Sequence, residues 1–140
     1  MFSMNDLQKE YKNEIQQLIN SPKYKLDKEN ISNTVTKKDR GIYAFYHNGT
    51  LIYIGQGGGN IDLNNTSTKL KERLLQYQRP KDGGTKNVKN YLKENCACYY
   101  DLEFSFISID DCRLIKIIEL VMIDYFKPQV NKWLCIWALG

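Results

Sequence analysis

One stretch of the sequence decides the fold: residues 41–55 read GIYAFYHNGTLIYIG. Two runs of β-branched and aromatic residues flank Asn48-Gly49, the dipeptide that a two-residue type I′ turn favours because both central residues adopt a positive φ. The stretch therefore predicts a β-hairpin. Counted outward from the turn, Tyr43 and Tyr53 are offset by one register step, so we expect diagonal neighbours rather than an opposed pair unless a bulge intervenes.

Hydrophobic periodicity outside the hairpin predicts the remaining elements. Alternating apolar residues predict a third strand over 102–109. Apolar residues at helical spacing predict helices over 5–20, from 67 or 68 to Pro80, from 85 onward, and from 110 or 111 to Pro128. These elements predict an α/β (α+β) fold: a small, mainly antiparallel three-stranded sheet flanked by helices, with an extra N-terminal helix.

The length of 140 residues fits one domain, which we divide into three parts. Residues 1–40 hold the N-terminal helix and a polar, lysine-rich connector, and residues 41–131 form the core. The hydrophobic tail, 132–140, is expected to pack on that core. No apolar run approaches the ~20 residues that cross a bilayer, and nothing resembles a signal peptide. We therefore expect a cytoplasmic protein that does not bind membranes.

Positive charge is concentrated in one segment of the chain. The whole chain carries a net charge of +4, but residues 69–93 contain eight basic and two acidic residues. Such a segment suits a polyanion, with a phosphate backbone as the first candidate, although a solvated helical face would show the same pattern. The basic residues that we assign to DNA binding are Lys69, Lys71, Arg79, Lys86 and Lys89.

The two ends of the hairpin carry the tripeptides GIY, at 41–43, and YIG, at 53–55. With these motifs the sequence resembles the GIY-YIG nuclease superfamily. The resemblance extends to an arginine on the next helix, an aromatic residue one turn later, a glutamate on the helix after the third strand, and an asparagine in a Pro-x-x-Asn run. The matching residues are Arg73, Tyr77, Glu119 and Asn131.

The resemblance implies a DNA endonuclease that leaves a 5′-phosphate and a 3′-hydroxyl. It implies one Mg²⁺ at Glu119, with Mn²⁺ as a substitute, and no small-molecule cofactor. It also implies that Tyr43 or Tyr53 assists the attacking water, with Tyr77 as a further candidate. One site cuts one strand, so a double-strand break needs a homodimer or two visits. We expect a restriction-type or phage-associated enzyme.

The chemistry of these residues supports the same roles, and each has a simpler alternative. Glu119 stands on an apolar helix, where a buried lone carboxylate needs a cation such as a divalent metal; the simpler alternatives are a salt bridge to Lys116 or an exposed position. Arg73 can stabilise charge on a phosphoryl group or be an ordinary surface arginine. Asn131 can position Glu119 or the phosphate by hydrogen bonding, or cap the turn after Pro128.

Two other functions remain open at this point. A non-catalytic nucleic-acid-binding module would keep the lysines without needing Glu119 beside Arg73. A partner-binding protein would use the apolar tail, 133–140, as its contact surface. One position departs from the family pattern, because Gln56 follows the YIG tripeptide where some members carry a lysine.

Overall fold

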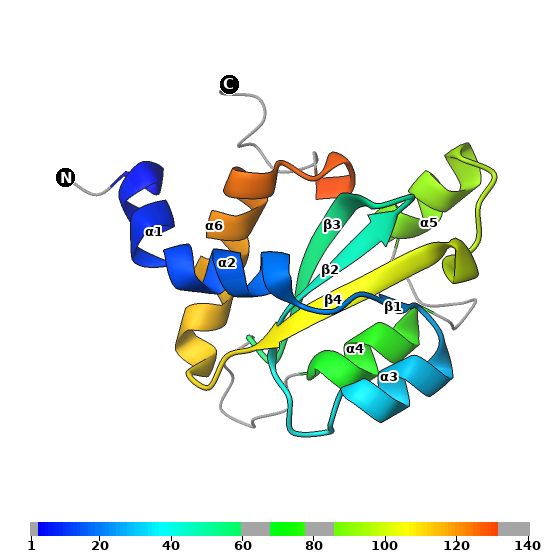
Figure 1. The fold of residues 1–140 in the computed structure, drawn as a ribbon, viewed down its shortest axis with the longest axis horizontal. Helices are drawn as coiled ribbons and strands as arrows, with labels where there is room; N and C mark the ends of the chain where they lie inside the picture. Colours follow the sequence, from blue (N-terminus) through cyan, green and yellow to red (C-terminus); the bar gives the residue numbers. More distant parts are fainter. Residues whose placement is uncertain (1–2, 60–67, 78–85, 132–140) are drawn as a thin grey trace.

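The computed structural model describes residues 3–59, 68–77 and 86–131 (Figure 1). Its fold is α+β, built on a four-stranded antiparallel sheet with the strand order β1-β4-β2-β3. The strands are β1 (Tyr24–Lys25), β2 (Gly41–His47), β3 (Thr50–Gly57) and β4 (Leu102–Ser108). The α-helices are α1 (Met4–Glu10), α2 (Lys12–Asn20), α3 (Lys28–Thr34), α4 (Leu70–Gln76), α5 (Lys86–Glu94) and α6 (Ile115–Phe126). Single 3-10 turns are η2 (Tyr99–Asp101), η3 (Cys112–Leu114) and η4 (Gln129–Asn131).

The hairpin predicted from the sequence is confirmed as β2 and β3. Asn48 and Gly49 form the turn with φ values of 51° and 81°, as a type I′ turn requires. The third predicted strand is β4, and it pairs with β2 on the side opposite β3. β2 is therefore central, and β3 is an edge strand of the sheet.

The N-terminal forty residues differ from the sequence prediction in two ways. The helix predicted over residues 5–20 is broken at Tyr11, which separates α1 from α2. The predicted connector contains α3 and the short strand β1, which adds a fourth strand beside β4. Asp27 caps α3, because its carboxylate accepts a hydrogen bond from the Asn30 N–H at 2.7 Å.

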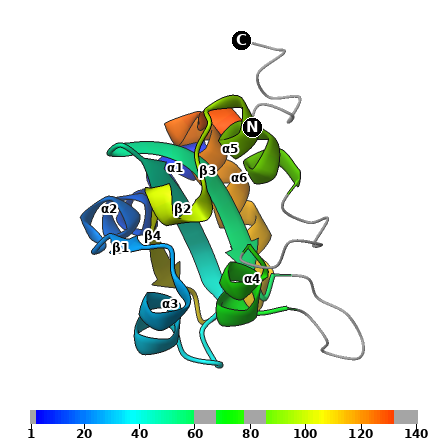
Figure 2. The ribbon, with the colours of Figure 1, turned by 90° about the vertical axis from the view of Figure 1, so that its right-hand side faces the viewer.

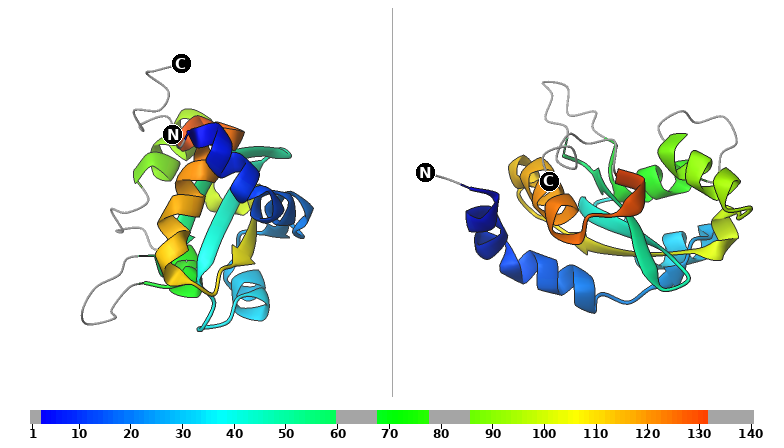
Figure 3. Two further views of the ribbon diagram at one scale, coloured as in Figure 1. Left: turned by 90° about the vertical axis from the view of Figure 1, so that its left-hand side faces the viewer. Right: turned by 90° about the horizontal axis from the view of Figure 1, so that it is seen from above.

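Helices cover both faces of the sheet, and each covered face has its own apolar core (Figure 3). On one side, α1, α2 and α6 cover strand residues that include Ile42, Ala44 and Ile54; we call this the α6-side core. On the other side, α3, α4 and α5 cover a core rich in aromatic rings, the tyrosine-side core. Its largest fully buried side chains are Tyr43, Phe45, Tyr77 and Phe104.

A β-bulge at Ile52 decides which face Tyr53 occupies. Phe45 pairs with Tyr53, whereas Tyr46 pairs with Leu51, so Ile52 is the extra residue. The bulge places Tyr43 opposite Gly55, two residues from Tyr53, and both tyrosines face the same side of the sheet. A regular two-residue hairpin would have put them on opposite faces, because a one-residue shift reverses the side of every side chain. The structure therefore offsets Tyr43 and Tyr53 by two residues along the strand pair, whereas a hairpin without a bulge would offset them by one.

Several predicted features lie outside the described residues. They include Arg79, the tail at 132–140, and residues 67 and 85, at which two helices are expected to begin. Within the described part, α4 begins after Lys69, and α6 begins after η3 and ends at Phe126, with Lys127 as its C-cap just before Pro128. No helix among the described residues combines the length and hydropathy needed to cross a membrane.

Candidate active site

Helices α4 and α6 both approach β3, the edge strand (Figure 2). Residues of these elements line a pocket of about 170 Å³. Helix α4 packs on the tyrosine-side core and α6 on the opposite face, so residues from both layers meet at this edge. The described residues that line the pocket are Tyr43, Tyr53, Gly55, Gln56, Arg73, Tyr77 and Glu119. The structure thus brings together five of the six catalytic residues predicted from the sequence.

Three tyrosines form the inner wall of the pocket. The hydroxyls of Tyr43 and Tyr77 are 2.6 Å apart, and both residues are only 1% exposed. Burial is the main cause that raises the pKa of Tyr43, Tyr53 and Tyr77 above the ordinary value of a phenol. The positive charge of Arg73 lowers the same pKa values but does not outweigh burial. The three phenols are therefore neutral at physiological pH.

The YIG glycine leaves room for the Tyr43 ring. Gly55 faces Tyr43 across the strands, and a Cβ at Gly55 would lie 2.4 Å from the Tyr43 hydroxyl oxygen. A side chain at this position would push the ring away from Tyr77. Gly41 also lacks room for a side chain: on the central strand β2, a Cβ at this position would lie 2.1 Å from the Ile107 carbonyl oxygen. Both glycines thus permit close packing that the tripeptides require.

Glu119 projects from α6 into the pocket. No hydrogen bond or ion pair connects its carboxylate to another described residue, although the positive charges of Lys116 and Arg73 both act on it. Burial outweighs these charges and raises the pKa of Glu119 to about 7. The salt bridge to Lys116 that the sequence left open is not formed among the described residues. A half-buried carboxylate without a partner is the group that a bound cation would stabilise.

The pocket also fits a hard divalent cation in its choice of donors. Its groups are one carboxylate, three phenol oxygens and the Gln56 amide, and Mg²⁺ prefers oxygen ligands while keeping several waters. No cluster of three or more His, Cys, Asp or Glu residues exists within the described ranges. Glu119 is thus the protein ligand that the pocket offers. The Nε of Arg73 is buried and has no hydrogen-bond partner in the described part of the chain, while the residue as a whole is half-buried and lines the pocket, so its positive charge can act on an anion bound there.

Asn131, the sixth predicted residue, does not line the pocket. Its Oδ1 accepts a hydrogen bond from the Ile54 N–H at 2.8 Å, and its Nδ2 donates to the Ile54 carbonyl at 3.0 Å. The side chain is 1% exposed and uses both ends of its amide on the main chain of β3. Asn131 therefore holds the backbone between Tyr53 and Gly55 and acts on the pocket through them.

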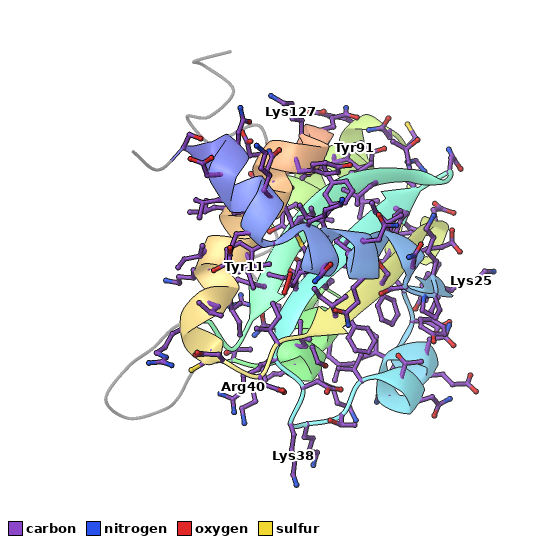
Figure 4. All side chains as sticks on the ribbon, turned by 60° about the vertical axis from the view of Figure 1, so that its left-hand side comes forward. Tyr11, Lys25, Lys38, Arg40, Tyr91 and Lys127 are labelled. Carbon is purple, nitrogen blue, oxygen red and sulfur yellow. The ribbon has the colours of Figure 1, made fainter. Side chains whose placement is uncertain are left out.

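The structure separates the predicted DNA-binding lysines into two groups. Lys69 is the N-cap of α4 and Lys71 lies in its first turn, near the end of β3, while Lys86 and Lys89 belong to α5. Helix α5 lies near the opposite end of β2, where the Tyr91 hydroxyl is 2.7 Å from Nδ1 of His47. Figure 4 shows this separation, with Tyr91 and Arg40 toward opposite ends of the molecule. The pocket lies between the two groups of lysines along the strands.

Sequence reasoning assigned no site role to Gln56, which lines the pocket. Its Oε1 accepts a hydrogen bond from the Gly59 N–H at 2.9 Å, and this bond folds the chain back directly after the YIG tripeptide. Its place directly after the YIG tripeptide is the signal that could have identified it, because strand alternation puts Gln56 on the same face as Ile54, the face that α6 with its Glu119 covers.

Comparison with solved structures finds domains that are similar to this chain. The chain matches the GIY-YIG N-terminal endonuclease domain of UvrC from Thermotoga maritima, bound to magnesium as its catalytic divalent cation. The TM-score is 0.49, the identity is 25%, and the match covers 74% of this chain and 97% of that one. Two point mutants of the same domain, also bound to the catalytic cation, match at 24% identity with the same TM-score. This chain is similar to a GIY-YIG endonuclease domain.

No protein-family model matches the sequence, and no curated protein matches it.

Proposed function

We propose that this chain is a metal-dependent DNA endonuclease of the GIY-YIG superfamily. The observation that carries the proposal is the unpaired Glu119 carboxylate, which lies in one pocket with Arg73 and three tyrosines. These groups come from both faces of the sheet and stand far apart in the sequence. A module that only bound DNA would gain nothing from a buried, unpaired carboxylate, which weakens the attraction for phosphate and costs stability.

Each residue has a distinct part in the proposed reaction, which breaks a phosphodiester bond with water. Glu119 would hold the divalent cation, which when bound supplies a Lewis acid for the scissile phosphate. Arg73, whose guanidinium lines the pocket, would donate hydrogen bonds to a phosphoryl oxygen and offset the negative charge that develops there. The rigid guanidinium stays charged at every relevant pH.

The tyrosines are suited to orient water rather than to carry a standing negative charge. Their raised pKa values keep them neutral, and a neutral hydroxyl can accept a hydrogen bond from water and donate one to its neighbour. Tyr53 is the most exposed of the three, whereas Tyr43 and Tyr77 are bonded to each other. We therefore assign the contact with the attacking water to Tyr53, and assign its support to the other two.

The finer identity of the enzyme remains part of the proposal. A restriction-type or phage-associated role, a homodimer for double-strand cleavage, a cytoplasmic location and the use of Mn²⁺ in place of Mg²⁺ are predictions from the sequence. The residue that touches the leaving group is also open, because Gln56 stands where some family members carry a lysine.

Plasmid cleavage tests the proposal. Purified protein is incubated with supercoiled plasmid and MgCl₂, beside an EDTA control and the Glu119→Gln variant, which keeps the size of the side chain. The exposed Glu94 on α5 supplies a matched control, Glu94→Gln. We expect nicking that disappears with EDTA, falls at least about 10³-fold in Glu119→Gln and is unchanged in Glu94→Gln.

Other outcomes would contradict the proposal. Salt-sensitive plasmid binding by every variant without nicking would favour the non-catalytic binding module. Nicking that survives in both EDTA and Glu119→Gln would point to a contaminating nuclease or to another site.

An Arg73→Lys variant keeps the positive charge but loses the planar guanidinium with its paired N–H donors, and we expect it to slow nicking by about 10²-fold.

A further inference from the structure

A second hollow, of about 400 Å³, borders α4 outside the active-site pocket. Its described lining consists of Lys37, Lys69, Lys71, Glu72 and Leu75, and we call it the lysine hollow. Three of these five side chains are cations and only one is an anion. Leu75 and the methylene stems of the lysines give the hollow an apolar floor beneath charged ends.

The lysines of the hollow come from two segments that the fold ties together. The Leu70 N–H donates a hydrogen bond to the Asp39 carbonyl at 3.2 Å, which joins the 36–40 loop to α4. The Asp39 carboxylate is bonded to the Thr36 N–H at 2.8 Å and to the Ser108 hydroxyl at 3.0 Å. The loop that carries Lys37 is thus anchored to α4 and to the end of β4.

The lysine hollow is close to the active-site pocket. A Cβ at Gly57 would lie 2.6 Å from the Leu70 backbone nitrogen. The start of α4 therefore packs directly on the end of β3, the strand that carries Tyr53, Gly55 and Gln56 of the pocket. Arg73 and Tyr77 line the pocket, while Lys71 and Leu75 of the same short helix line the hollow. A helix with its side chains is about 10 Å across, so the two sites are separated by a distance of that order.

We propose that the lysine hollow binds a backbone phosphate of the DNA strand whose neighbouring phosphate enters the active-site pocket. Three ammonium groups around one hollow repel each other, and no ion pair neutralises them among the described residues. A phosphate removes that repulsion, and the sugar attached to it meets the apolar floor. The inference rests on the proposed function, and it adds Lys37, which lies outside the basic segment at 69–93.

Salt-dependent binding tests this inference. A fluorescent DNA duplex is titrated with protein at several NaCl concentrations in MgCl₂, and Glu119→Gln serves as the parent so that the duplex stays intact. Lys37→Gln and the double variant Lys37→Gln/Lys71→Gln are compared with a control of equal charge change. That control is Lys9→Gln/Lys12→Gln, on exposed positions of α1 and α2.

The slope of log Kd against log salt concentration is the deciding quantity. Each phosphate contact contributes about 0.9 to that slope on duplex DNA. We expect Lys37→Gln to lower it by about 0.9 and the double variant by up to about 1.8, while the control keeps the parental slope. A double variant with the slope of the control would overturn the inference, as would a parent whose binding does not depend on salt.

The plasmid assay separates this inference from the proposed function. If the wild-type protein nicks plasmid but the slopes are equal, the nuclease stands and the lysine hollow does not bind DNA. If the slopes differ as expected but no nicking occurs, the hollow binds DNA and the nuclease proposal fails. Thermal unfolding of each variant shows whether it is folded, and these exposed or half-exposed lysines are not needed by the core.

Discussion

The two faces of the sheet use the same tripeptides for opposite purposes. Ile42 and Ile54, the central residues of GIY and YIG, enter the α6-side core, where strand and helix side chains are almost entirely apolar. The flanking Tyr43, Tyr53 and Gly55 face the other way and form the active-site pocket. One face gains stability from burial, and the other places polar groups where they are costly. The comparison shows that alternate residues of one strand can be divided between folding and chemistry.

The largest effect is expected on the apolar face. Replacing Ile42 by Ala removes a fully buried side chain next to Tyr43, and we expect it to lower the free energy of unfolding by about 2–5 kcal/mol. Urea denaturation followed by circular dichroism measures the change. Cleavage per folded molecule should be retained, and a loss below 1 kcal/mol would show that the α6-side core tolerates the cavity.

A smaller loss of stability is expected at the contact between η4 and the edge strand β3. Asn131→Ala removes both hydrogen bonds to Ile54 and leaves its backbone groups unpaired, so we expect a loss of about 2–3 kcal/mol and reduced nicking. Asn95→Ala is the matched control, because the exposed Asn95 amide also donates to a backbone carbonyl. Equal losses in the two variants would contradict the positioning role of Asn131.

In the active-site pocket, removing the charge of Glu119 should stabilise the protein. Because burial raises the pKa of Glu119 to about 7, the native state keeps a proton that the unfolded chain loses near its ordinary pKa. The free energy of unfolding of the metal-free protein should therefore fall as pH rises between about 4.5 and 7. Glu119→Gln removes this cost, so we expect a gain of about 1–3 kcal/mol at pH 8 and none at pH 4.

Denaturation curves at both pH values, with Glu94→Gln as the control, check that sign. A Glu119→Gln variant that is less stable than wild type at pH 8 would mean that the carboxylate has a partner in solution. A stabilised variant that no longer cuts would show directly that the Glu119 carboxylate lowers the stability of the protein and is nevertheless needed for cleavage.

The smallest effect should come from one hydroxyl. Tyr77→Phe removes the hydrogen bond to Tyr43 but keeps the ring packing, so we expect a change of about 1 kcal/mol in the free energy of unfolding. Tyr125→Phe, at a residue that is 49% exposed, should change nothing. The rate of nicking should fall more in Tyr77→Phe than this change in stability explains. Equal nicking rates for Tyr77→Phe and the wild-type protein would show that the hydrogen bond between the Tyr43 and Tyr77 hydroxyls has no part in the mechanism.

The sequence was sufficient for the hairpin and for most of the site because local rules determine them. Asn48-Gly49 specifies the turn, and alternation specifies the strands. The resemblance to the GIY-YIG superfamily identified Arg73, Tyr77 and Glu119, which the structure brings into one pocket. Their convergence is a property of the tertiary fold, which the resemblance implied and the residues by themselves did not.

The features that the sequence did not reveal depend on long-range contacts. β1 has only two residues, too few for a pattern, and it exists because β4 offers it an edge. The bulge at Ile52 leaves no mark in an unbroken apolar run. Lys37 was assigned to a connector because nothing local shows that Asp39 ties its loop to α4.

The amide of Asn131 also has a consequence for self-association. An edge strand with free N–H and C=O groups is a template on which another chain can add a strand, and this is a common route to aggregation. At Ile54 those groups are already occupied by a side chain from η4. A second copy of this chain that tried to extend the sheet at β3 would have to displace Asn131 from Ile54 first. The single amide thus keeps the edge that carries the active-site pocket open to a substrate and closed to strand addition.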